Sequence, residues 1–380
     1  MPGQRQNLKR IVSTAGAFIA FMIGSGFATG QEILQYFASY GLWGLGGIVI
    51  CFALLMYVSI SYVRVGFQKK FSRPSLIYTY YCGKYVGIFF DYFTVAAIYL
   101  CFTVMIAGAG ATMKQHFGLS TTVGAVAMGI LACITVMFGL KRMVDIIGKI
   151  GPVIIVLVMV LGVGAIVQGG MENLGETAVR IQEMDLMRAS SNWAFSAFSY
   201  VGISIVWLAT FMTALGSDSE SSRDASIGAG LGVTAFSFGM VIMAIALMLH
   251  IDLVAGTQIP SLVLAEGISP FLAAVFTVIV VAGIYTTAVP LLWTVTSRLT
   301  PDGTPRFRTV TCVLAVIGTL VGLLIPFSKL VNVVYVLIGY LGFILLGFML
   351  VKQLRSIAFR VQKSSSGKMT NRVAFKGEQE

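Results

Sequence analysis

The sequence predicts an all-α polytopic membrane protein with about ten transmembrane helices. Of its 380 residues, 57% are apolar and only 11% are charged. The mean hydropathy is +0.90, and long apolar runs recur along the whole chain. A soluble domain cannot hide this much apolar surface, because its outside must be wetted. In lipid the backbone must satisfy its own hydrogen bonds, which favours helices.

Ten segments are long enough to cross a hydrocarbon core of about 30 Å, which takes roughly 20 helical residues. They are residues 9–38, 41–65, 85–113, 118–140, 146–168, 192–216, 225–249, 268–298, 307–325 and 328–354. Glycines interrupt the first segment. Only the sequence "PFSK" separates the last two.

The basic residues predict the orientation of these spans in a cell membrane. With ten spans and a cytoplasmic N-terminus, 22 of the 26 Lys and Arg residues lie on the cytoplasmic side. Such a bias is the usual signature of cytoplasmic loops. We therefore expect both termini inside, and a basic tail near the anionic inner leaflet. The basic residues are scattered among loops, so we expect no nucleic acid partner.

A long loop, residues 169–191, divides the ten segments into five and five. We expect an N-terminus (1–8), a first repeat (9–168), this extracellular loop, a second repeat (192–354) and a cytoplasmic tail (355–380). Two five-helix halves are typical of inverted-repeat transporters, whose binding site lies where interrupted helices meet. Segment 192–216 carries "FSAFSYVGISIVW". We therefore predict breaks in both the first and the sixth span.

The first span contains the motif "MIGSGFATGQEI", with Gly24, Gly26 and Gly30 close together. A broken membrane helix frees peptide groups that are costly in hydrocarbon unless something polar meets them. The freed N–H groups can hold an anion and the freed carbonyls a cation. Ser25 and Thr29 add hydroxyls. Close packing of two helices through small residues is the alternative; the carboxylate that follows favours a binding site.

That carboxylate is Glu32. A charge inside the membrane costs about 2.5–3.5 kcal/mol on insertion scales, so it usually faces a cavity or a partner. Glu32 would begin the outer half of the first span, where the helix dipole favours an acid. It is a candidate anchor for a substrate ammonium or a proton acceptor, and a structural capping role is the alternative.

The motifs "IGSGFATGQE", "GKIGP" and "AGAGA" resemble those of the YkvI-like amino acid permeases of Gram-positive bacteria. These belong to the amino acid–polyamine–organocation superfamily, which has the LeuT fold. The resemblance covers about residues 8–355. It implies a 5+5 inverted repeat with substrate between helices 1 and 6. Around Gly24 and Thr29, the residues Ser25, Gly26 and Phe27 would meet an amino acid carboxylate, and Tyr200, Gly202 and Ser204 would face it.

The resemblance also implies where an ion or proton could couple to transport. Several superfamily members that do not need sodium carry a lysine on helix 5 in place of a sodium ion, and Lys149 matches that place. Thr286 and Thr287 on helix 8 would supply hydroxyls. In the alternative, these threonines bind Na⁺ and Lys149 points away. In a third interpretation, the aliphatic part of the Lys149 side chain lies in lipid and its ammonium reaches the headgroups.

Two further residues are candidates inside the membrane. Asp91 lies near the inner end of the third span, as a partner for Lys84 or Lys149 or as a proton relay. Tyr99, near the centre of that span, could close over a substrate, although buried tyrosines often simply find a hydrogen-bond partner.

We predict a secondary transporter of a small zwitterion, an amino acid, that is proton-coupled or ion-independent. A sodium-coupled transporter of the same fold is the alternative. From another class, a non-transporting sensor resembling a spore-germination receptor subunit would use the same fold. We expect no enzyme activity, no cofactor and no metal site, because no paired carboxylates, Walker A motif or ligand cluster occur in the sequence.

Overall fold

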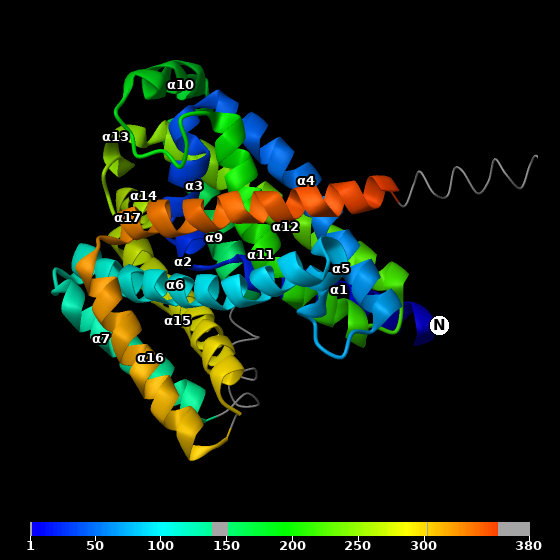
Figure 1. The fold of residues 1–380 in the computed structure, drawn as a ribbon. Helices are drawn as coiled ribbons and strands as arrows, with labels where there is room; N and C mark the ends of the chain where they lie inside the picture. Colours follow the sequence, from blue (N-terminus) through cyan, green and yellow to red (C-terminus); the bar gives the residue numbers. More distant parts are fainter. Residues whose placement is uncertain (1, 139–150, 302, 356–380) are drawn as a thin grey trace, which may run out of the picture.

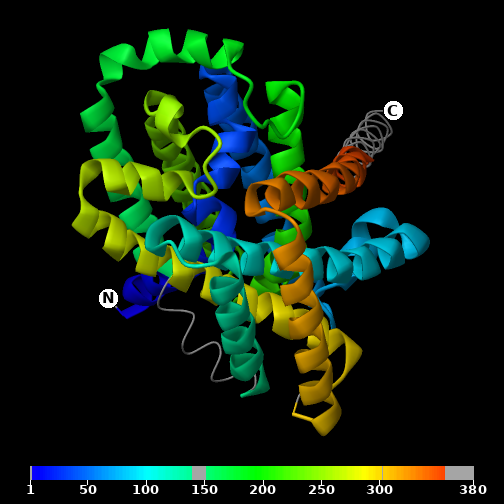
Figure 2. The same cartoon turned by 90° about the vertical axis from the view of Figure 1, so that its left-hand side faces the viewer.

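The computed structural model describes residues 2–138, 151–301 and 303–355. These residues form helices and connecting turns, with no β-strand among them. Figure 1 shows long helices crossing one another in a bundle, with α10 (Leu174–Glu183) at one end. The N-terminus lies away from that end in both views (Figures 1 and 2). We call the two ends the α10 end and the N-terminal end.

The first predicted span is three helices: α1 (Pro2–Met22), α2 (Ser25–Ala28) and α3 (Gln31–Tyr36). A short 3₁₀ turn, η1 (Ala38–Tyr40), then leads into α4. Other predicted spans appear as α4 (Leu42–Lys69), α6 (Lys84–Phe117), α7 (Thr121–Met137), α9 (Gly151–Gly169), α12 (Ser222–Leu249), α15 (Pro270–Leu299) and α16 (Pro305–Leu324).

The last span runs from Phe327 to Arg355 and is not a regular α-helix throughout. Its first turn is α17 (Phe327–Leu330), and a π-helical segment, η3 (Val331–Tyr335), follows. A π-helical turn inserts one extra residue into a helix and is often found at functional sites.

Seven helices in the described residues are long and apolar enough to cross a membrane, and an eighth is counted if the bent pair formed by α9 and α10 is one span. The chain is therefore a membrane protein with several apolar helices. α7 is apolar but has only 17 residues. The ends of the predicted spans 118–140 and 146–168 that meet at residues 139–150 lie outside the described residues, as does the tail from residue 356.

The predicted break in the sixth span was wrong. The structure instead has one continuous helix, α11 (Trp193–Asp218). Its small residues serve packing: a Cβ atom on Gly202 would lie 1.9 Å from the carbonyl oxygen of Gly339 in the last span. The hydroxyl of Ser204 donates to the carbonyl of Tyr200 within the same helix. These groups are satisfied without interrupting the helix.

Four short helices lie between the spans where the sequence analysis expected loops. One is α5 (Leu76–Cys82), between α4 and α6. Two more are α13 (Ile251–Val254) and α14 (Pro260–Ile268), between α12 and α15. The fourth, α10, lies in the long loop. The side chains of Asn192 and Thr304 accept hydrogen bonds from backbone N–H groups at the starts of α11 and α16. Such N-caps are the usual way to begin a helix.

The helices pack in recurring pairs. α1 lies against α12 and α4 lies against α11, while α4 and α12 also touch. Around this group, α6 packs on α15 and α7 packs on α16, and the two views show α7 and α16 side by side (Figures 1 and 2). The short helices α5 and α14 rest on α6 and α15 respectively. The interrupted first span, α1 to α3, runs inside this arrangement, and its breaks are buried.

Candidate functional site

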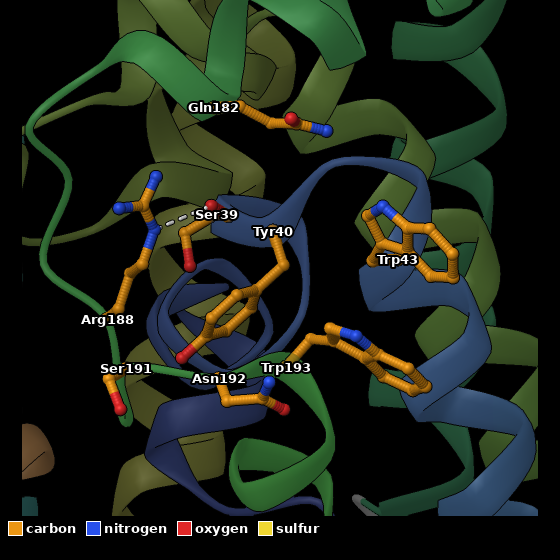
Figure 3. Close-up of a pocket in the computed structure, with 8 residues that line it drawn as sticks. All are labelled: Ser39, Tyr40, Trp43, Gln182, Arg188, Ser191, Asn192 and Trp193. Atoms are coloured by element: carbon orange, nitrogen blue, oxygen red, sulfur yellow. Dashed lines mark hydrogen bonds between the residues drawn. The ribbon is translucent and has the colours of Figure 1, made fainter.

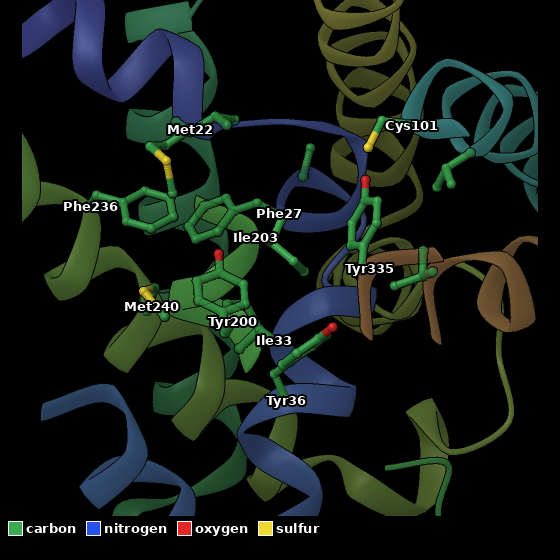
Figure 4. Packing of buried hydrophobic residues seen from close by; sticks show 14 of the residues in the cluster. Met22, Phe27, Ile33, Tyr36, Cys101, Tyr200, Ile203, Phe236, Met240 and Tyr335 are labelled. Atoms are coloured by element: carbon green, nitrogen blue, oxygen red, sulfur yellow. The ribbon is translucent and has the colours of Figure 1, made fainter. Parts of the chain in front are cut away.

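The first span is interrupted twice within eight residues. Gly24 is extended, with φ −93° and ψ −172°, and it separates α1 from the single turn of α2. Gly30 is left-handed, with φ +78°, and separates α2 from α3. Residues with a side chain rarely adopt that conformation, so the second break depends on glycine. The two breaks leave α2 as an isolated turn among buried side chains (Figure 4).

Glu32, in the first turn of α3, is 2% exposed. Its Oε2 accepts a hydrogen bond from the Tyr200 hydroxyl at 3.3 Å. Its Oε1 is buried and has no partner among the described residues. The side chain folds back against α2, because a Cβ atom on Gly26 would lie 2.0 Å from Oε1. Gly26 therefore makes room for the carboxyl group.

Other buried polar atoms without a partner gather near this carboxyl group. These unpartnered atoms belong to Ser25, Tyr36, Ser199, Trp207 and Tyr335. Together with the bonded pair Glu32 and Tyr200, we call these residues the break site. The rings of Tyr36 and Tyr200 meet edge to face at 5.3 Å, and those of Trp207 and Tyr335 do so at 5.4 Å. Figure 4 shows Tyr36, Tyr200 and Tyr335 around the interrupted helix. Buried polar atoms beside aromatic rings could bind a small polar solute.

The carbonyls freed by the second break are met by α14. The Ser261 backbone N–H donates to the Thr29 carbonyl at 2.9 Å, and its hydroxyl donates to the Ala28 carbonyl at 2.8 Å. These two carbonyls are therefore not open to a cation in this conformation. The Thr29 hydroxyl turns inward and donates to the Gly26 carbonyl at 3.2 Å.

Side chains from distant segments close the α10 end of the site. The Asn332 amide donates to Gln35 Oε1 at 3.1 Å and to the Arg188 carbonyl at 3.0 Å. The Gln35 amide donates to the Ser328 carbonyl at 2.9 Å, and Gln258 exchanges two hydrogen bonds with Ser328. We call these contacts the closure network. They join α3, the long loop, the α13–α14 turn and the last span.

A surface cavity of about 210 Å³ lies beyond the closure network (Figure 3). The Arg188 guanidinium forms part of its wall and donates from Nε to the Ser39 carbonyl at 3.0 Å. The same guanidinium lies over the Tyr40 ring, and Trp43 stacks on Trp193 at 5.6 Å. The cavity is separate from the break site, which is more deeply buried.

The structure brings several predicted residues to the break and moves others away. Gly24, Ser25, Gly26, Phe27 and Thr29 line it, and Phe27 packs on Phe236 at 5.0 Å between ring centroids. In contrast, the placement of Tyr99 at the site was wrong: its hydroxyl donates to the Leu314 carbonyl of α16 at 2.9 Å. Gly202 and Ser204 serve helix packing and local bonding, as described above.

Of the candidate coupling residues, the structure describes Thr286, Thr287 and Asp91. A Cβ atom on Gly24 would lie 3.9 Å from the Thr287 methyl group, so α15 does reach the first break. The hydroxyls of Thr286 and Thr287 both donate to the Gly283 carbonyl of their own helix. Asp91 pairs with Arg298 at 2.6 Å, so Lys84 was the wrong partner. Lys149 lies outside the described residues.

Sequence reasoning missed Tyr36, Ser199, Trp207 and Tyr335. Tyr36 lies in the predicted first span, on α3, and Ser199 and Trp207 lie in the motif of the sixth span, on α11. Tyr335 gave no signal, because it reaches the break only through the packing of the last span. Among the described residues, no group of three or more His, Cys, Asp or Glu side chains could hold a metal ion.

No family model matches the chain. The chain is similar to two proteins of Bacillus subtilis (strain 168). One is the uncharacterized membrane protein YkvI, with 19% identity over 345 residues, 89% of this chain and 95% of YkvI. The other is the uncharacterized protein YyaD, with 24% identity over 338 residues, 86% of this chain and 91% of YyaD. The resemblance to YkvI-like membrane proteins is confirmed.

Solved structures of the same fold are membrane transporters. MhsT in complex with L-phenylalanine aligns with a TM-score of 0.60 at 15% identity, covering 89% of this chain and 87% of MhsT. A Na⁺-coupled sialic acid symporter aligns with 0.58 at 13% identity, covering 90% and 78%. Mhp1, a nucleobase–cation symporter, aligns with 0.54 at 17% identity, covering 85% and 74%. The chain therefore has the LeuT fold that these membrane transporters share.

Proposed function

We propose that the protein is a secondary active transporter that moves a small zwitterionic solute, an amino acid, by alternating access. The observation that carries the proposal is Glu32. Its carboxyl group is buried in a twice-broken membrane helix, and Oε1 has no partner among the described residues. A buried polar group without a partner is costly. A solute that supplies the missing partner would repay that cost only while it is bound.

The order of the helices supports an inverted repeat of residues 9–168 and 192–354. If α1, α4 and α6 correspond to α11, α12 and α15, the contact of α1 with α12 corresponds to that of α11 with α4. The packing of α5 on α6 likewise corresponds to that of α14 on α15. Each pair of contacts is what two halves related by a two-fold axis would make. Ten spans with both termini cytoplasmic remain part of this proposal.

Charge balance supports a proton as the coupling ion. Glu32 and Asp224 are the buried charged side chains of the described residues, and Asp224 lies in the first turn of α12. Within residues 2–138, 151–301 and 303–355, the titratable groups around Glu32 are Tyr36, Tyr200, Tyr335 and the Cys101 thiol. None of these balances an anion. One proton on Glu32, together with a zwitterion, leaves the loaded site neutral.

Sodium coupling is the alternative, with Na⁺ held by Thr286 and Thr287 near the first break. It competes with the proposal that the Lys149 ammonium occupies that place. In either scheme helix 8, here α15, contacts the interrupted helix beside Gly24.

The alternation would move α1, α4, α11 and α12 as a group against the remaining helices. Arg10 of α1 pairs with Glu220 of the α11–α12 turn, inside that group. Asp91 and Arg298 join α6 to α15, inside the other group. At the α10 end, the hydrogen bonds of Ser261 and of the closure network join the groups through neutral partners, and the Arg188 guanidinium adds one bond to the Ser39 carbonyl. Neutral bonds of about 1 kcal/mol each can open within a transport cycle.

The proposal is tested by flux of labelled amino acids into proteoliposomes. An inward proton gradient is expected to drive accumulation, and replacing sodium by choline is expected to leave the rate unchanged. Strict dependence on sodium would reverse the choice of coupling ion. Binding of an amino acid, seen as a raised melting temperature, without flux under any gradient would instead identify a sensor of the same fold.

A further inference from the structure

We infer that the solute carries a hydrogen-bonding group beyond its ammonium and carboxylate, and that Tyr335 and Trp207 select for it. The solute class is then a neutral amino acid with a hydroxyl or amide side chain, rather than an aliphatic one. This inference rests on the proposed function and concerns the same site.

Tyr335 is placed at the site by the π-helical segment at the start of the last span. Its side chain is fully buried, yet its hydroxyl has no hydrogen-bond partner among the described residues. Figure 4 shows the hydroxyl pointing towards Cys101 across the interrupted helix. Ser25 lies beside it, and the Ser25 hydroxyl also lacks a partner at hydrogen-bonding geometry.

Trp207 reaches the same place from α11. Its ring meets that of Tyr335 at 87° and 5.4 Å between centroids. Its Nε1–H group is buried without a hydrogen-bond partner and lies beside the Cys101 thiol. An indole N–H can only donate. Because a thiol sulfur is a weak acceptor, the indole N–H is a donor that lacks a strong acceptor among the described residues.

The number of open groups exceeds what the backbone of an amino acid needs. Glu32 Oε1 can receive an ammonium, and Ser25 and the nearby peptide groups can meet a carboxylate. Of the other open groups, the hydroxyls of Tyr36 and Ser199 lie beside each other, whereas Tyr335 and Trp207 remain on the side of the site next to Cys101. A site that is built to hydrogen-bond a solute group rejects an analogue that lacks the group, because its own polar atoms stay unpaired.

Threonine and valine test this inference, because they have nearly the same shape and differ by one hydroxyl group. Uptake of each into proteoliposomes is compared for the wild type, Tyr335→Phe and Trp207→Phe. The wild type is expected to prefer threonine at least about 10-fold. Each variant is expected to bring the ratio below about 3-fold by losing threonine uptake while valine uptake persists.

Tyr340→Phe is the matched control, because Tyr340 lies on the same span and is 47% exposed; it is expected to keep the wild-type ratio. Tyr335→Phe should leave the melting temperature nearly unchanged, because its hydroxyl makes no hydrogen bond of normal geometry among the described residues and has the Ser25 hydroxyl beside it. Equal uptake of valine and threonine by the wild type would overturn the inference while leaving the transporter intact. An unchanged ratio in both variants would also overturn it. Absence of uptake for every amino acid would defeat the proposed function itself.

Discussion

Replacing Glu32 with Gln is expected to abolish proton-driven uptake while the protein stays folded. The amide keeps an oxygen for the Tyr200 hydroxyl, which now donates at 3.3 Å to Oε2. It cannot take up or release a proton, and with its oxygen held by Tyr200 it presents an N–H₂ group to the solute ammonium in place of the Oε1 acceptor. A hydrogen bond to a charged group is worth about 1.5–3 kcal/mol, so solute binding should weaken by about 10- to 150-fold. Uptake as a function of pH, together with binding by thermal shift, measures both effects.

Glu172→Gln is the matched control for this variant, because Glu172 is exposed in the turn η2 (Met171–Asn173). It should change neither uptake nor its dependence on pH. If the Glu32→Gln protein instead takes up solute at the wild-type rate and with the wild-type pH dependence, Glu32 only caps α3.

Replacing Gly202 with Ala is expected to give the largest loss of stability. The new methyl group would lie 1.9 Å from the Gly339 carbonyl oxygen. A Cβ atom on Gly342 would likewise lie 1.9 Å from the Gly202 carbonyl oxygen, so the two backbones are in close contact. Both obstacles are backbone, so α11 and the last span must move apart. Overpacking of this kind costs about 1–3 kcal/mol. The melting temperature of the detergent-purified protein should therefore fall.

Gly347→Ala provides the comparison, since it lies on the same span with no other atom within 4 Å of the added Cβ atom. Alanine favours a helix over glycine, so this variant should keep or slightly raise the melting temperature. Equal melting temperatures for the two variants would show that α11 does not pack tightly on the last span.

The interruption of the first span could be read from local sequence, because Gly24 and Gly30 adopt conformations at the breaks that depend on residues close by. The same reading misled at the sixth span. Glycine and serine in a membrane helix can signal either a break or close packing. Gly202 packs against Gly339 and Gly342, which lie about 140 residues further along the chain. No local sequence pattern reveals this contact.

Partners across the fold were equally hidden. Asp91 was recognised as an unusual acid, but Arg298 becomes its partner only because α6 packs on α15. Tyr99 bonds to α16 for the same reason. Tyr335 reaches the break site from the π-helical segment of the last span. The sequence of that segment does not predict a π-helix.

The native thiol of Cys101 gives the most direct test that the interrupted helix holds the travelling solute. Cys101 is fully buried and lies beside Trp207 and Tyr335, whereas Cys51 is equally buried but bonds to the Ala197 carbonyl. Modification of each thiol by a small water-soluble reagent is measured by peptide mass spectrometry in proteoliposomes. The account predicts that Cys101 reacts as the site opens, that the transported solute protects it, and that Cys51 stays unmodified. A Cys101 that never reacts, or that reacts equally with and without solute, would contradict it.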